Sequence, residues 1–141
     1  RNVLGLRGAN TTEIDANTKF PVIDLMEDQK SVTNLGGSMR LGLYDCSINT
    51  DSNTYKEYCK KDIKERHRHR YEFNNEFRDK FMKNGMMLAG INKEKNLVEI
   101  IELENHPWFI GVQFHPEYKS TVKAPHPLFI GFIKAAIDKK G

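Results

Sequence analysis

The sequence GVQFHPEY, residues 111–118, continues an apolar run that begins at Trp108. An apolar run of this length, bounded by chain-breaking residues, predicts a buried strand over residues 108–114. Pro116 disfavours the helical region for the preceding residue, so His115 is expected to stay extended. Side chains two positions apart on an extended segment share a face, which brings the imidazole of His115 to the carboxylate of Glu117. The stretch therefore predicts a general base and the acid that orients it.

The segments around this strand alternate between strand and helix patterns. Residues 86–91 and 97–103 flank a polar turn and predict a hairpin, while Asn74 should cap a helix over residues 75–83 that stops at Gly85. A last amphipathic helix is expected over residues 127–139. The other expectations are a glycine-closed helix end at 1–8, a polar turn at 9–13, an extended piece at 20–26, a break at 34–38, a strand at 39–44, a polar loop at 45–53 and a short helix at 54–61 capped by Asn53 or Thr54. The predicted fold class is one mixed α/β unit in which several neighbouring strands are antiparallel.

Composition bounds the classes of function. The chain has 141 residues, of which 38% are hydrophobic, so it is long enough for one domain with a core. A net charge of +3 does not by itself call for nucleic acid or an anionic membrane, and no apolar run approaches the roughly 18 residues of a membrane span. Cys46 and Cys59 give neither a disulfide framework nor metal-ligand spacing, so no metal site is expected and a reducing, cytoplasmic location is the default.

The sequence ERHRHRYEF, residues 65–73, has a strict period of two. Two sets of side chains should project from opposite faces of a strand. One set is Arg66, Arg68 and Arg70, and the other is His67, His69 and Tyr71. A solvated charged face is one interpretation and a phosphate-binding patch is another, although no basic tail or nucleic-acid motif supports nucleic-acid binding. A third interpretation is that at least one arginine captures a small carboxylate, which a guanidinium does with two parallel hydrogen bonds.

Glu13 follows two threonines in a turn. Its carboxylate is an ordinary loop or capping group by default, and in a functional site it would hold an ammonium group. An arginine for a carboxylate, an acid for an ammonium and a His–Glu pair for catalysis together describe a site for a free amino acid.

Several segments resemble the CTP synthase family, in order, over nearly the whole chain apart from residues 45–62. The most specific are ERHRHRYE at 65–72 and NLGGSMRLG at 34–42, and the others are RNVLGL at 1–6, ANTTE at 9–13, PVIDLM at 21–26, VEIIELENHP at 98–107 and PLFIGFI at 127–133. The HPE of residues 115–117 recurs across class I glutamine amidotransferases and identifies only that superfamily. The resemblance implies that residues 1–141 are the C-terminal part of such a domain, an α/β fold with a mixed sheet and flanking helices.

In that family a cysteine attacks the side-chain amide of L-glutamine, and the released ammonia serves a synthetase domain that aminates ATP-activated UTP to CTP. His115 matches the family's general base and Glu117 the residue that orients it, while Glu13 and Arg70 match the positions that bind the amino-acid end of glutamine. The resemblance also implies ATP, Mg²⁺ and the activator GTP for the intact enzyme, none of them bound by this segment, and a homo-tetramer assembled chiefly through the synthetase domain. Arg40 is a conceivable contact of the activator, although nothing in the sequence itself places it there.

The chain departs from the family pattern at the nucleophile. The family carries its cysteine in a Gly-x-Cys-x-Gly elbow, and neither Cys46 nor Cys59 has that setting. The resemblance puts the elbow upstream of Arg1, so we expect the chain to carry half of a site, to be inactive alone, and to expose apolar surface or depend on a partner segment. The alternative is a non-catalytic interaction or regulatory module that retains the amidotransferase fold.

Overall fold

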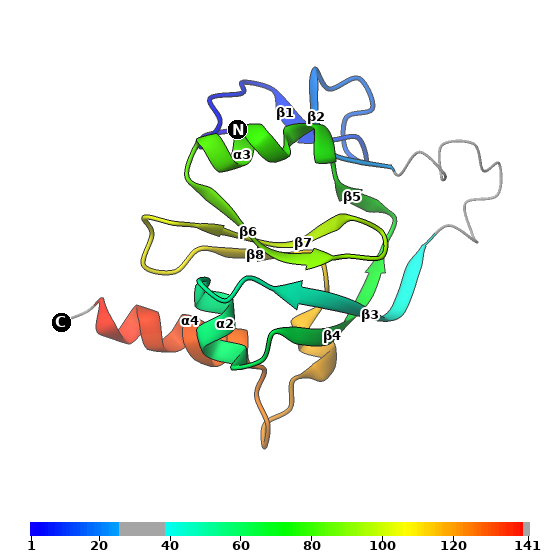
Figure 1. Ribbon diagram of the computed structural model, residues 1–141. Coiled ribbons are helices and arrows are strands. Elements are labelled where there is room, and N and C mark those ends of the chain that lie inside the picture. Colours follow the sequence, from blue (N-terminus) through cyan, green and yellow to red (C-terminus); the bar gives the residue numbers. More distant parts are fainter. Residues whose placement is uncertain (26–38, 140–141) are drawn as a thin grey trace.

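The computed structural model describes residues 1–25 and 39–139, and within these ranges the strands form two sheets with helices around them (Figure 1). The small sheet has the strand order β1-β2-β5, with β1 (Ala9–Thr11), β2 (Phe20–Leu25) and β5 (Tyr71–Phe73). The large sheet has the order β4-β3-β6-β7-β8, with β3 (Arg40–Ile48), β4 (Asp62–His69), β6 (Met86–Asn92), β7 (Leu97–Leu103) and β8 (Ile110–Val112). β1 and β2 pair in parallel and the other pairs are antiparallel, so the predicted mixed α/β class is confirmed.

Local antiparallel pairing builds most of the large sheet. β3 and β4 pair from Arg40 opposite His69 to Ser47 opposite Asp62, and β6 and β7 form the predicted hairpin. The alternation expected for β4 is also present, since Ile63, Glu65 and His67 are buried while the residues between them are exposed. The period-two pattern therefore identified the strand and the separation of its two faces, and the structure shows that the face with His67 is the buried one.

A capping side chain precedes several of the helices. α2 (Asn53–Tyr58) starts after Ser52, whose side chain accepts a hydrogen bond from the Tyr55 amide, so the predicted cap at Asn53 or Thr54 and the predicted range 54–61 were wrong. The 3-10 turn η2 (Asn75–Phe77) leads into α3 (Arg78–Lys83), and Asn74 caps that pair as predicted. The 3-10 turn η3 (Pro116–Lys119) follows β8, and α4 (Pro127–Asp138) begins after the cap residue His126. Figure 1 shows α3 near the small sheet, whereas α2 and α4 lie together at the other end of the molecule.

Several expected boundaries were wrong. Residues 1–8 form turns rather than a helix end, with Gly5 and Gly8 at positive φ, and residues 9–11 of the expected polar turn form strand β1. β3 continues to Ile48 through the expected polar loop because Cys46 and Ile48 are buried against neighbouring strands. Strand β8 covers only part of the predicted range 108–114, and the expected break at 34–38 lies outside the described residues.

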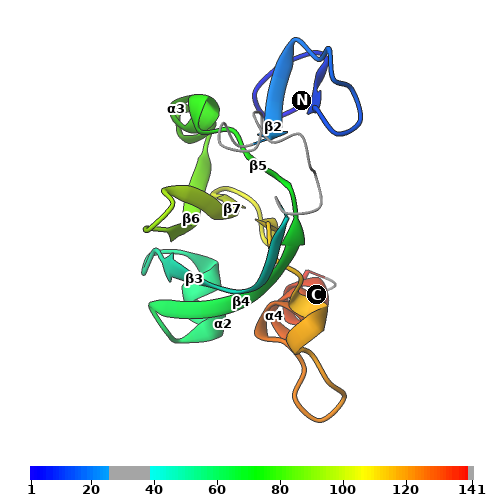
Figure 2. The same ribbon diagram turned by 90° about the vertical axis from the view of Figure 1, so that its right-hand side faces the viewer.

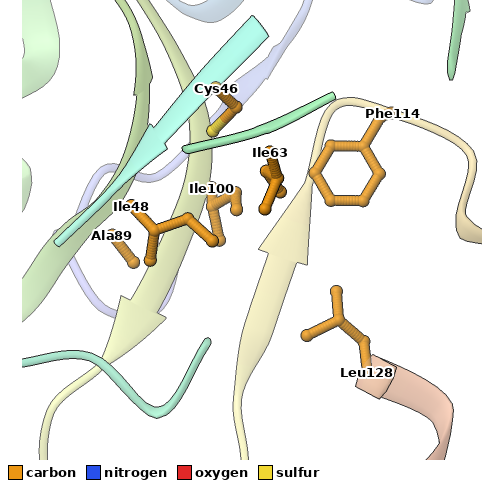
Figure 3. Close-up of a cluster of buried hydrophobic side chains, with 7 residues drawn as sticks. All are labelled: Cys46, Ile48, Ile63, Ala89, Ile100, Phe114 and Leu128. Carbon is orange, nitrogen blue, oxygen red and sulfur yellow. The ribbon is translucent and has the colours of Figure 1, made fainter. Parts of the chain in front are cut away.

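One apolar cluster joins the large sheet to α4 (Figure 3). Its members come from β3, β4, β6, β7, the segment after β8, and α4: Cys46, Ile48, Ile63, Ala89, Ile100, Phe114 and Leu128. Gly131 lets α4 approach Trp108 closely, since a Cβ at that position would lie 2.2 Å from the indole ring. The rest of the apolar face of α4 is uncovered, with Ile133 55% and Ile137 64% exposed. This agrees with the expectation from the sequence that the chain exposes apolar surface.

A buried ion-pair network connects the two sheets. Arg40 of β3 donates from Nη1 to both carboxylate oxygens of Glu72 in β5, each at 3.2 Å, and from Nη2 to Glu99 of β7 at 2.8 Å. All three side chains are at most 3% exposed. Gln113 adds a hydrogen bond to Glu72 at 3.2 Å. Arg40 is therefore engaged inside the protein, which leaves it no surface for the activator contact considered from the sequence.

Two neutral histidines complete this network. His69 Nδ1 lies 3.1 Å from the Tyr71 carbonyl oxygen, which can only accept, so His69 carries its proton on Nδ1 and accepts on Nε2 from His67 Nδ1 at 2.7 Å. Burial, reinforced by the positive charge of Arg40, lowers the pKa of His67 to about 3 and the pKa of His69 to about 4. Both rings are therefore uncharged at neutral pH and can lie beside a guanidinium.

The burial of His67 predicts a pH dependence of stability. In the unfolded chain this imidazole binds a proton below about pH 6.5, whereas in the folded chain it stays neutral to about pH 3. Because the unfolded state binds more protons in this window, His67 lowers the stability of the folded state as pH falls through it. We expect His67→Gln to reduce the slope of unfolding free energy against pH by about 1.4 kcal/mol per pH unit between about pH 6 and pH 4.

Urea unfolding of the 141-residue chain, followed by the fluorescence of Trp108, the single tryptophan within these residues, measures this slope. His106→Gln, at an exposed position, is the matched control and should leave the slope as it is. Equal slopes in His67→Gln and the unsubstituted protein would contradict the account.

Candidate functional site

The pair predicted from the HPE sequence is present in the fold. His115 Nδ1 lies 2.7 Å from Glu117 Oε1, and the backbone of His115 is extended at φ −107° and ψ 93°, as expected before proline. Because a carboxylate accepts, Nδ1 is the donor and Nε2 is left as the basic nitrogen of the neutral ring. The imidazole is 37% exposed, so this nitrogen is accessible to a ligand.

Local contacts hold the histidine in this orientation. Its backbone N–H donates to the Arg66 carbonyl oxygen of β4 at 2.9 Å, and its ring stacks on Tyr118 with the centroids 4.9 Å apart. The hydrogen bond from His115, with a further backbone bond, lowers the pKa of Glu117, so this carboxylate is ionised at neutral pH. An ionised acid on Nδ1 is the arrangement that stabilises an imidazolium formed during proton transfer.

A cavity of about 500 Å³ brings Glu13 and Arg70 together. Glu13 comes from the loop after β1, while Arg70 stands where the chain leaves β4 and enters β5, passing from the large sheet to the small one (Figure 2). Gln113, two residues before His115, lines the same cavity. The other lining residues are Thr11, Ile23, Met39, Arg68, His69 and Tyr71.

Glu13 and Arg70, which share this cavity with the charged side chain of Arg68, are available to a ligand. Among the described residues, neither the Glu13 carboxylate nor the Arg70 guanidinium has an ion pair or a side-chain hydrogen bond, and Arg70 Nε is buried without a partner. A buried donor without a partner costs free energy that a bound anion would recover. A cavity that contains a free carboxylate and a free guanidinium suits a zwitterion such as an α-amino acid.

Neither cysteine belongs to this site. Cys46 lies in the core cluster at 1% exposure, and burial, followed by the charges of Glu99 and Glu65, raises its pKa to about 12 (Figure 3). Cys59 is exposed after α2 and donates from Sγ to the Lys56 carbonyl oxygen. Neither lines the cavity that contains Glu13 and Arg70.

The sequence did not indicate every residue of the site. Gln113 was recognised only as part of a strand, although it both lines the cavity and donates to Glu72. Arg40 and Glu72 stand in the two most specific motifs, yet their pairing requires the two sheets to be in contact. Within the described ranges no cluster of three or more histidine, cysteine or acidic residues could hold a metal ion, and no helix is long and apolar enough to span a membrane.

Comparison with known proteins identifies the family. The model of the glutamine amidotransferase class-I family matches residues 7–135. The chain is 62% identical over 136 residues to a CTP synthase of Christiangramia forsetii, covering 96% of this chain and 25% of that protein. It is 58% identical over 140 residues to a CTP synthase of Clostridium acetobutylicum, covering 99% of this chain and 26% of that protein.

A solved structure agrees with these relatives. The Trypanosoma brucei CTPS glutaminase domain with bound acivicin superimposes with a TM-score of 0.87 at 32% identity, covering 98% of this chain and 54% of that one. The chain spans about a quarter of the length of the curated relatives it matches. It belongs to the class I glutamine amidotransferase family, and its relatives within that family are CTP synthases.

Proposed function

We propose that this chain provides the general base and the amino-acid recognition of a glutaminase within a CTP synthase. The longer protein would hydrolyse L-glutamine and use the ammonia for the ATP-dependent amination of UTP to CTP. The observation that carries the proposal is the cavity lined by unpaired Glu13 and Arg70 beside the strand that leads to the His115–Glu117 pair. The names of the relatives support the activity of the whole protein.

Substrate recognition follows from the two charges. Arg70 binds the α-carboxylate of glutamine through its planar fork, and Glu13 binds the α-ammonium group. A compound that lacks either the carboxylate or the ammonium group would leave Arg70 or Glu13 without a partner. The site therefore rejects such compounds. Held at this end, the substrate directs its side-chain amide away from the clamp and toward His115.

The chemistry requires a thiol in addition to these residues. We place the nucleophilic cysteine in a part of the protein outside these 141 residues, because neither Cys46 nor Cys59 stands at the cavity. His115 Nε2 takes the thiol proton while the sulfur attacks the amide carbon, and Glu117 stabilises the imidazolium. The imidazolium then protonates the departing nitrogen, which leaves as ammonia. His115 next takes a proton from the water that hydrolyses the thioester, which releases glutamate and regenerates the thiol.

The remaining requirements of the reaction belong to other parts of the protein. We place ATP and Mg²⁺ in the synthetase domain of the longer protein. GTP as activator, assembly as a homo-tetramer and a cytoplasmic location complete the proposal.

A non-catalytic regulatory module is the second candidate, and the absence of a suitable cysteine in this sequence favours it. The amino-acid sequence of the full-length protein discriminates between the two. A Gly-x-Cys-x-Gly elbow supports the enzyme, and its replacement by other residues supports the module.

Replacement of the proposed base gives the main test. In the full-length protein, we expect His115→Ala to lower glutamine-driven CTP formation by roughly 10²- to 10⁴-fold, because this base serves glutamine hydrolysis alone. CTP formation from added ammonia should be unchanged. His106→Ala is the control for loss of an exposed imidazole and should retain both activities. Equal losses with glutamine and with ammonia would remove His115 from the proposed role.

A second substitution tests the clamp. Arg70→Lys keeps the charge but loses the planar fork, so we expect the KM for glutamine to rise roughly 10- to 100-fold while kcat changes little. Steady-state glutaminase kinetics measure both constants. Arg7→Lys makes the same change at an exposed position outside the cavity and should leave KM unaltered. An unchanged KM in Arg70→Lys would show that this arginine does not bind the substrate.

A further inference from the structure

A second cluster of buried polar side chains lies between β4 and the start of α4. Glu65 of β4 is 1% exposed, and its Oε1 receives Tyr58 Oη at 3.0 Å and Lys119 Nζ at 3.3 Å. His126 Nε2 lies 3.4 Å from the same oxygen, while Oε2 is buried without a partner. A buried carboxylate stays ionised only where cations and donors offset the loss of water.

The hydrogen bonds in this cluster have a defined direction. His126 Nδ1 accepts from the Leu128 amide at 3.3 Å, so the neutral ring carries its proton on Nε2. That N–H faces Tyr58 Oη at 3.0 Å, and the Tyr58 hydroxyl donates to Glu65. Burial alone would raise the pKa of Glu65, but the His126 bond, the charge of Lys119 and the Tyr58 bond together lower it. Glu65 is therefore a negative charge whose positive partner is Lys119.

Lys119 also fastens η3 to β4. Its Nζ donates to the Lys64 carbonyl oxygen at 2.6 Å in addition to its contact with Glu65. At the other end of the turn, the His115 amide donates to the Arg66 carbonyl oxygen at 2.9 Å. The turn is thus attached to β4 on both sides of Glu65, and Glu117 lies between the two attachments (Figure 1, where the orange turn runs beside β4).

Burial contributes little to the position of this turn. No residue of η3 is buried, and His115 makes no side-chain cap to it. The Glu117 carboxylate is 55% exposed, so packing does not restrict it. Apart from the hydrogen bond from the Tyr118 amide to the His115 carbonyl oxygen and the stacking of the two rings, the position of Glu117 beneath the imidazole depends on the two attachments of the turn to β4.

We infer that Lys119 is a positioning residue for the His115–Glu117 pair: by joining η3 to buried Glu65 and to the Lys64 carbonyl, it keeps Glu117 on Nδ1 of His115. This inference rests on the proposed function, because it concerns how the proposed base is oriented. Lys119 does not line the cavity that contains Glu13 and Arg70, so its contribution is to the proton-transfer steps and not to glutamine binding.

The test uses Lys119→Met in the full-length protein, which keeps the length of the side chain and removes its charge and donors. Small displacements of a catalytic group carry large penalties, so we expect kcat for glutamine hydrolysis to fall roughly 10- to 100-fold. The KM for glutamine and the rate of CTP formation from ammonia should stay unchanged. Lys119→Arg, which retains a charged donor, should recover most of kcat.

Lys64→Met is the matched control. It makes the same substitution at the neighbouring strand position, where Nζ pairs with exposed Asp45, and it keeps the carbonyl that Lys119 uses. An unchanged kcat in Lys119→Met, a rise in KM alone, or equal losses with glutamine and ammonia would overturn the inference. Failure of the proposed function is a distinct result, since glutamine-driven activity would then survive His115→Ala.

Discussion

The Arg40 guanidinium, shared between Glu72 and Glu99, is the interaction on which the arrangement of the site depends. It joins β5 of the small sheet to β3 and β7 of the large sheet in a place that water does not reach. Burying three charges yields little net stability, yet removing one partner of a buried pair costs about 3–5 kcal/mol. We therefore interpret the network as a device that fixes one relative position of the two sheets.

The ionisation of this network is balanced internally. Burial raises the pKa of Glu72 and the pKa of Glu99, although the positive charge of Arg40 acts in the opposite direction on both carboxyl groups. Burial also opposes the charge of Arg40, but its bonds to the two carboxylates outweigh that effect and raise its pKa, so the guanidinium stays charged. The neutral rings of His67 and His69 add bulk and hydrogen bonds without adding positive charge. Arg70, for which we propose a role in substrate binding, lies one position after His69 and lines the cavity.

Local features of the sequence were predictable because their causes are local. The period of two in β4, the hairpin of β6 and β7 and the cap at Asn74 depend on neighbouring residues. The proximity of His115 and Glu117 was predictable for the same reason, since a proline and a spacing of two place both side chains on one face. The attachment of their turn to β4 through Lys119 is not local and was not predicted. The convergence of Glu13 and Arg70 on one cavity came from the family resemblance, and their spacing alone indicated no more than the type of site.

Non-local features could not be predicted in this way. Arg40 and Glu99 are 59 residues apart, and only the assembled sheets bring them together. Polar Asp45 and Ser47 suggested a loop, but pairing with β4 extends β3 through them. The strand at residues 9–11 exists through parallel pairing with β2, which no local pattern indicates. In each of these places the partner, and not the segment's own propensity, determines the structure.

A structure of the full-length protein with L-glutamine bound, its nucleophilic cysteine replaced to prevent turnover, would show whether this cavity binds the substrate as proposed. We expect the α-carboxylate on Arg70 and the α-ammonium on Glu13, each at about 2.7–3.2 Å, with the side-chain amide facing Nε2 of His115. Glutamine bound elsewhere, or bound in this cavity with its α-carboxylate turned away from Arg70, would contradict it.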